Sequence, residues 1–193
     1  MSALCSIEVL AYGANNNGTT RYGYVKLNTV PVWQASWHGG FHNPRGVNII
    51  LVDHFMCSVR EIRQFDTHGN ANATVDLILY LQQVYRGTII VGVSADAATR
   101  LLYRAQPTLE EIGANVADVQ TRGSFGFVAQ KGFPAKTVLR KALTEADSFT
   151  NQPHFDVTIT GTIYCINSAL IPAKLSRTCC SYLLTIYSIT GWS

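Results

Sequence analysis

The chain has 193 residues, of which 47% are hydrophobic and 14% charged, so it carries enough apolar material for one buried core. Its formal net charge of +3, with lysine and arginine scattered along the chain, is too small for the concentrated basic surface that binds a phosphate backbone, and we expect no nucleic-acid partner. The nearly uncharged run 178–193 is shorter than the roughly 20 residues of a membrane-spanning helix, so we expect no membrane insertion.

The N-terminal part of the chain predicts a β-hairpin at the edge of a sheet. Strand-like patterns in residues 6–12 and 22–27 flank the run 13–18, whose Asn and Gly residues tolerate positive φ. Met1 leads directly into this strand pattern without the basic start and long apolar block of a signal peptide. We therefore expect an incomplete N-terminus or a domain within a larger precursor.

The middle of the chain predicts a central strand with a partner. Residues 47–52 form a continuous apolar run of strand length, which is typical of a strand covered on both faces. Residues 59–65 alternate imperfectly and are predicted to pair with it as a second hairpin.

Helical spacing follows. Apolar residues fall at i, i+1, i+4, i+7 and i+8 at Leu77, Ile78, Leu81, Val84 and Tyr85, which predicts a helix with one stripe against the sheet. Arg86-Gly87 should end this helix before a β-branched strand at 88–94.

A second helix is predicted within residues 98–112, with a break near Pro107, because an interior proline costs about 3 kcal/mol. Residues 125–129 and 156–160 supply further strands. This order predicts an α+β fold, a β-sandwich of mostly antiparallel strands flanked by two helices. We assign residues 1–165 to one globular domain and expect the atypical apolar tail 166–193 to lie outside the native domain.

Catalytic and metal motifs are missing from the sequence. It has neither a Gly-x-Ser-x-Gly elbow nor a phosphate-binding Gly-Lys-Ser/Thr loop, and no two acids stand out as a pair with separated pKa values. His38 and His42 are four residues apart, but the Gly-Gly between them disfavours the helix that would join them on one metal. We expect no enzyme activity, no metal and no cofactor.

A spaced series of short motifs runs from Arg45 to Gly132. In order they are Arg-Gly-Val-Asn, Gln-Phe-Asp-Thr, Gly-Thr-Ile-Ile-Val, Ser-Ala-Asp-Ala-Ala-Thr, Ile-Gly, Arg-Gly-Ser-Phe-Gly-Phe and Lys-Gly. The series resembles the ILEI (interleukin-like inducer) domain of the "family with sequence similarity 3" secreted cytokine-like proteins. That domain also occurs in the stem of protein O-mannose N-acetylglucosaminyltransferase and in cell-migration-inducing hyaluronan-binding protein. The resemblance covers about residues 5–165 and implies sugar binding or signalling rather than catalysis.

The resemblance also implies a site. Its sugar contacts fall on Arg45, Asp96 and Arg122, and two guanidinium groups and a carboxylate can bracket the hydroxyls and acetamide of a sugar. Phe125 is the candidate aromatic ring for the apolar face of that sugar. The family's usual Arg-Asp-x-Trp reads Arg122-Gly-Ser-Phe125 here, so an acid and an indole are lost. A structural alternative stays open for Arg45, which could satisfy carbonyl groups at a turn.

Cysteines and sequons complete the expectations. The resemblance implies a disulfide between Cys5 and Cys165, and we expect Cys57 to be a structural thiol. Asn17 and Asn72 begin Asn-x-Thr sequons and are candidate glycosylation sites. Asp66 is expected to cap the helix that follows it.

Three functions remain open. The first is an extracellular lectin-like domain that binds a glycan, such as one containing N-acetylglucosamine. The second is a secreted cytokine-like protein that acts through a cell-surface protein receptor. The third is a non-catalytic module of a larger glycan-processing or cell-surface protein. All three place the chain outside the cell or in the lumen of the secretory pathway.

Overall fold

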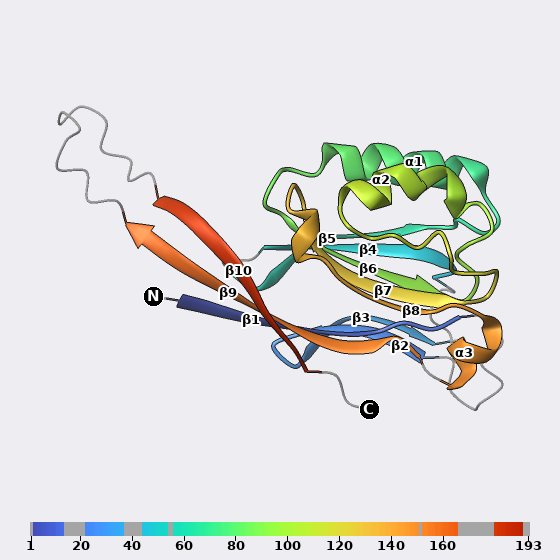
Figure 1. Ribbon diagram of the computed structural model, residues 1–193, viewed down its shortest axis with the longest axis horizontal. Coiled ribbons are helices and arrows are strands. Elements are labelled where there is room, and N and C mark those ends of the chain that lie inside the picture. The colour runs from blue at the N-terminus through green and yellow to red at the C-terminus, as the bar shows by residue number, and fades with distance from the viewer. Residues whose placement is uncertain are drawn as a thin grey trace.

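The chain forms three layers in a computed structural model that describes residues 2–13, 22–36, 44–53, 56–150, 152–165 and 180–190. Two helices cover one face of a five-stranded sheet, and the other face of that sheet packs on a second five-stranded sheet (Figure 1). All strand pairs are antiparallel. The predicted α+β sandwich is therefore confirmed.

The middle layer, which we call the central sheet, carries the helices. In spatial order its strands are β5 (Ser58–Phe65), β4 (Gly46–Asp53), β6 (Ile89–Ala95), β7 (Ser124–Gln130) and β8 (Val138–Ala142). Every residue of β6 and β7 is buried, and so is every residue of β4 before Asp53, because both faces of these strands are covered.

The other layer, which we call the outer sheet, is built from the two ends of the chain. In spatial order its strands are β10 (Cys180–Thr190), β9 (His154–Cys165), β1 (Ser2–Leu10), β2 (Tyr22–Leu27) and β3 (Val30–Ser36). Burial alternates residue by residue along β2, as expected for a strand with one face on the core and one facing solvent.

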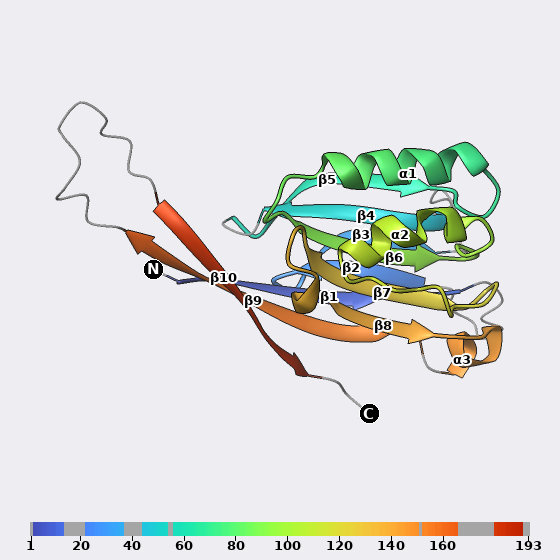
Figure 2. The same cartoon turned by 45° about the horizontal axis from the view of Figure 1, so that its top comes forward.

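The helices are short except for the first. α1 spans Ala71–Gln83, α2 spans Gln106–Glu111 and α3 spans Glu145–Thr150, and the 3₁₀ segments are η1 (Leu102–Ala105) and η2 (Pro134–Lys136). In Figure 2, α1 and α2 lie over the central sheet and α3 lies at one end of the sandwich. Among the described residues, no helix is long and apolar enough to cross a membrane.

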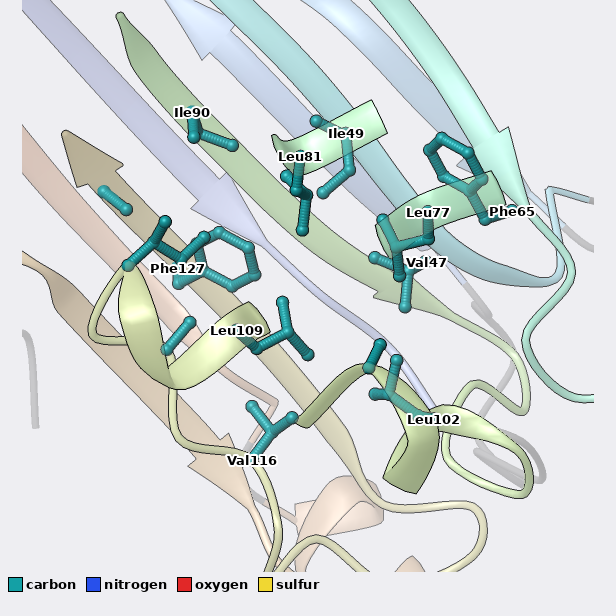
Figure 3. Close-up of a cluster of buried hydrophobic side chains, with 14 of the residues drawn as sticks. Val47, Ile49, Phe65, Leu77, Leu81, Ile90, Leu102, Leu109, Val116 and Phe127 are labelled. Atoms are coloured by element: carbon teal, nitrogen blue, oxygen red, sulfur yellow. The ribbon is translucent and has the colours of Figure 1, made fainter. Parts of the chain in front are cut away.

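Two hydrophobic clusters join the layers. One fills the space between the sheets and includes Val9, Val25, Ile50, Val91 and Val157. The other lies between the central sheet and the helices, where Leu77, Leu81 and Leu109 meet Ile49 and Phe127 (Figure 3). Leu77, Leu81 and Val84 of the predicted stripe are buried. Tyr85 is not part of it, because α1 ends at Gln83, before the predicted stop at Arg86-Gly87, and Tyr85 is 83% exposed.

Several local predictions are corrected. The N-terminal hairpin is not at an edge, because β1 lies between β2 and β9. Asp66 does not cap α1; Asn70 occupies the N-cap position and its side chain accepts a hydrogen bond from the amide of Asn72. The predicted break near Pro107 falls where η1 gives way to α2, and Pro107 itself lies in the first turn of α2, where the amide that proline lacks would have no helical partner.

The disulfide prediction is wrong, because Cys5 is bonded to Cys57, with 5.3 Å between their Cα atoms. Cys5 of β1 faces Ile159 of β9, and Cys165 lies six positions farther along β9, roughly 20 Å away. Cys57, in the turn between β4 and β5, lies within reach instead. Cys57 is therefore a disulfide partner that joins the two sheets, not a free thiol.

The segment 166–193 contributes a strand. β10 pairs with β9 from Cys180, opposite Cys165, to Thr190, opposite Asp156. The remaining parts, 166–179 and 191–193, lie outside the described residues, and so do Asn17, His38 and His42. The domain boundary at residue 165 stays a prediction.

Candidate functional site

Arg45 and Asp96 lie at the same end of the central sheet. Arg45 immediately precedes β4 and Asp96 immediately follows β6, and these two strands pair with Gly46 opposite Ala95. The antiparallel register therefore places the two predicted site residues side by side, although they are about 50 positions apart in the sequence.

Arg45 is fixed in place by Asp66, which follows β5 at the same end. Its Nε and Nη2 atoms donate to the two carboxylate oxygens of Asp66 at 3.0 and 2.6 Å, the two-point geometry that suits a guanidinium and a carboxylate. The Gly69 amide also donates to Asp66, at 2.9 Å. Both charged side chains stay partly exposed, at 39% for Arg45 and 31% for Asp66.

This pair shifts both pKa values toward the charged forms. The hydrogen bond to Asp66 raises the pKa of Arg45 above its ordinary value. Burial alone would raise the pKa of Asp66, but the bonds from Arg45 and Gly69 outweigh it and lower that pKa. Both groups are therefore charged at neutral pH, and Arg45 is presented in one orientation.

Asp96 adds a carboxylate beside this pair. It is half-buried and has a φ of +55°, a left-handed conformation that Asp tolerates better than most residues. Its charge acts on both Arg45 and His68. No donor among the described residues bonds to its carboxylate, which leaves the acceptor available to a ligand.

His68 was missed by the sequence reasoning. Burial first, and then the charges of Arg45 and Arg100, lower its pKa, so the imidazole is neutral at neutral pH. Its Nδ1 atom is buried and has no hydrogen-bond partner among the described residues. The signal that could have pointed to His68 is its position directly after the Gln-Phe-Asp-Thr motif, two residues from Asp66.

Arg122 lies at the same end of the sheet but has a partner of its own. It precedes β7, has a φ of +71°, and donates from Nη1 to Glu145 of α3 at 3.3 Å. Its side chain is 46% exposed. The three predicted contacts thus share one end of the sheet, and the structure pairs Arg122 with α3.

Phe125 cannot serve as the predicted stacking ring. It is fully buried in the cluster between the central sheet and the helices, together with Phe127. Residues two apart on a strand point to the same face, so both rings enter the core and neither faces a ligand. This part of the predicted site is wrong.

The described residues contain no group of three or more His, Cys, Asp or Glu side chains that could hold a metal ion. Asn72, the described sequon, is exposed at the start of α1, and its glycosylation stays a prediction.

Comparison with known proteins identifies the domain that carries this end of the sheet. No curated protein matches the chain. Residues 45–133 match the model of the family described as "Interleukin-like EMT inducer". The matched range begins at Arg45 and contains Asp66, Asp96 and Arg122. Residues 45–133 are therefore similar to an interleukin-like EMT inducer (ILEI) domain, as the order of the motifs predicted.

Proposed function

We propose that this protein is a non-enzymatic, extracellular recognition module that binds carbohydrate at the end of the central sheet marked by Arg45 and Asp96. The match to the ILEI family supports a cytokine-like or stem-like module, and sugar is the ligand class that we infer for it. The Cys5–Cys57 disulfide suits an oxidising compartment and so supports the extracellular location.

One observation carries the proposal: a guanidinium held in a two-point ion pair lies next to a carboxylate that has no partner among the described residues. A sugar hydroxyl both donates and accepts, so it can bridge Arg45 and Asp96. Because Asp66 already orients Arg45, little side-chain entropy is lost on binding. Arg122 extends the same end with a second partly exposed guanidinium.

A second candidate is signalling through a protein receptor. Val75 and Leu79 are one helical turn apart on the outward side of α1 and are 46% and 51% exposed. Neighbouring apolar side chains on an exposed helix face are typical of protein contacts when they belong to a larger patch. A cell-surface protein would be the partner in this case.

A glycan-array screen of the full-length, oxidised protein tests the first candidate. Asp96→Asn is the informative variant, because Asn also tolerates a left-handed conformation while it removes the charge. Asp76→Asn is its control, since Asp76 is an exposed acid on α1. We expect selective binding that Asp96→Asn reduces and Asp76→Asn does not.

Arg122→Ala extends this test to the third predicted contact, with Arg140→Ala as an exposed arginine control on β8. A folded wild-type protein that binds no glycan on the array would reject carbohydrate recognition and favour the receptor candidate. Val75→Glu with Leu79→Glu would then be the variants to compare in a cell-binding assay.

A further inference from the structure

A groove opens at the opposite end of the central sheet from Arg45. It has a volume of about 580 Å³ and lies between the C-terminal end of α1 and the edge strand β5. Figure 2 shows α1 lying over β5 along this edge. This volume falls within the range of cavities that bind small molecules in proteins.

The floor of the groove is formed by largely buried, mostly apolar side chains. Leu51, Tyr80 and Val84 line it and are each less than a tenth exposed. Tyr85, just past the end of α1, also lines the groove and is 83% exposed, the largest exposed fraction among the exposed large hydrophobic side chains of the described residues. An aromatic ring left this exposed beside an apolar floor is suited to cover the apolar face of a ligand.

The wall on β5 is polar and held in position. Arg63 donates from Nε to Glu61 at 2.5 Å, and its guanidinium lies over the Tyr80 ring, 4.6 Å from the centroid. The Tyr80 hydroxyl donates to the other oxygen of Glu61 at 3.1 Å. Glu61 therefore orients both neighbours, and both Nη atoms of Arg63 have no acceptor among the described residues.

Arg60 forms the outer part of the same wall. Its Nε and Nη2 atoms donate to one oxygen of Asp53, at 3.0 and 2.5 Å, and its side chain is 51% exposed. The positive charges of Arg60 and Arg63 are thus balanced by the negative charges of Asp53 and Glu61. The wall offers directional N–H donors without a net charge, which suits a neutral ligand better than an anion.

From these features we propose that the α1–β5 groove is a second carbohydrate site, which binds a neutral sugar with one face on Tyr85 and its hydroxyl groups on Arg60, Arg63 and Gln83. The inference shares its ligand class with the proposed function but none of its residues, so either site can fail without the other. The two sites lie at opposite ends of β4, about 20 Å or more apart, so one long glycan or two separate chains could occupy them.

An alternative ligand for this part of the molecule is a peptide that adds to β5 as a new strand, and the edge of β5 does not favour it. β5 pairs with β4 through Val59 and Glu61, and Arg60 between them is left out of the register as a bulge. Bulges and charged side chains are the means by which natural edge strands resist pairing with another chain. A sugar in the groove does not require an open strand edge.

An NMR titration of the isotope-labelled full-length protein tests this site. The probes are the methyl glycosides of glucose, galactose, N-acetylglucosamine and glucuronic acid at millimolar concentrations. We expect at least one neutral glycoside to shift the Gln83 side-chain amide and the Tyr85 and Thr88 backbone amides in a saturable way. Shifts by the glucuronide alone, or by none of the probes, would overturn the proposal.

Variants locate the effect. Tyr85→Ala should weaken binding about two- to tenfold, because an aromatic contact of this kind is lost while the exposed ring contributes little to the fold. Tyr103→Ala removes a tyrosine that is 64% exposed on η1 and should leave the titration unchanged. Equal affinity of Tyr85→Ala and wild type would contradict the groove site.

Asp96→Asn separates the two proposals. It should leave the shifts at Gln83, Tyr85 and Thr88 intact, whatever it does to binding at the Arg45 end. If Asp96→Asn abolishes the shifts in the groove, the groove is not an independent site and the inference is wrong.

Discussion

Gly92 of β6 lies directly against the ring of Phe127 on the neighbouring strand β7. The two residues face each other in the register, and a Cβ added to Gly92 would come within 2.2 Å of two ring carbons. The ring therefore occupies the space of the missing side chain and covers the backbone of the strand.

Gly92→Ala should destabilise the protein by about 1–3 kcal/mol, because the new methyl group must displace a fully buried ring. Urea unfolding would measure the change. Gly87→Asn is the control, since Gly87 has a positive φ that Asn tolerates and open space around it, and it should change stability by less than about 1 kcal/mol. The double variant Gly92→Ala/Phe127→Leu should recover part of the lost stability, whereas additive losses would show that the ring is not the cause.

Reduction of the Cys5–Cys57 bond should lower the free energy of unfolding. The bond closes a loop with a sequence separation of 52, which corresponds to about 4 kcal/mol in the loop-entropy model. Thermal unfolding with and without a reductant gives the size of the effect, and a Cys5→Ala/Cys57→Ala double variant should lose the response to reductant. A peptide map that joins Cys5 to Cys165 instead would refute this pairing.

Stability should fall in acid as Glu8 is protonated. Burial alone would raise the pKa of Glu8, but hydrogen bonds from Tyr24, Lys26 and His154 lower that pKa from 4.5 to about 2. The stabilisation by a carboxylate with a lowered pKa is fully present above pH 4.5 and is lost as the pH falls toward about 2. Denaturant unfolding across this pH range should show that Glu8→Gln removes part of the acid dependence. Glu111→Gln, at an exposed position of α2, should leave it unchanged.

Pro107→Ala should change stability by less than about 1 kcal/mol, because Pro107 lies in the first turn of α2, where proline is tolerated. An interior proline is unfavourable by about 3 kcal/mol relative to alanine, so its replacement there would stabilise the protein by a similar amount. Chemical denaturation distinguishes the two cases. A gain of about 3 kcal/mol would mean that the proline strains the helix.

The strands with continuous apolar runs, β4 and β6, could be predicted because burial on both faces leaves a direct mark on the sequence. β3 was not predicted, because Pro31, its second residue, disfavours a strand. The structure places β3 at the edge of the outer sheet, where a proline is tolerated. β8 is short, and with Arg140 and Lys141 next to each other its sequence does not show the alternation of apolar and polar residues that is typical of a strand. Edge strands depend on their neighbours more than on their own pattern.

The site was predictable in part. The motifs that contain Arg45 and Asp96 mark the ends of β4 and β6, and the register brings them together. The pairing of Arg45 with Asp66, the burial of Phe125 and the partner of Cys5 depend on how three strands and a turn meet in space. Local spacing carries no information about such contacts.

The pairing of β1 with β9 sets the order in which the molecule can be assembled. The family-matched range 45–133 contains four strands of the central sheet, whereas every strand of the outer sheet comes from the flanks of this range. Cys5 meets Ile159 only after nearly the whole domain has been synthesised, and such distant pairings form slowly. A fragment limited to residues 45–133 would leave Ile50, Val91 and Val128 on a bare apolar face, so we expect it to aggregate rather than fold alone. The smallest unit that can be produced as a stable protein is therefore longer than the sequence signature by which the domain is known.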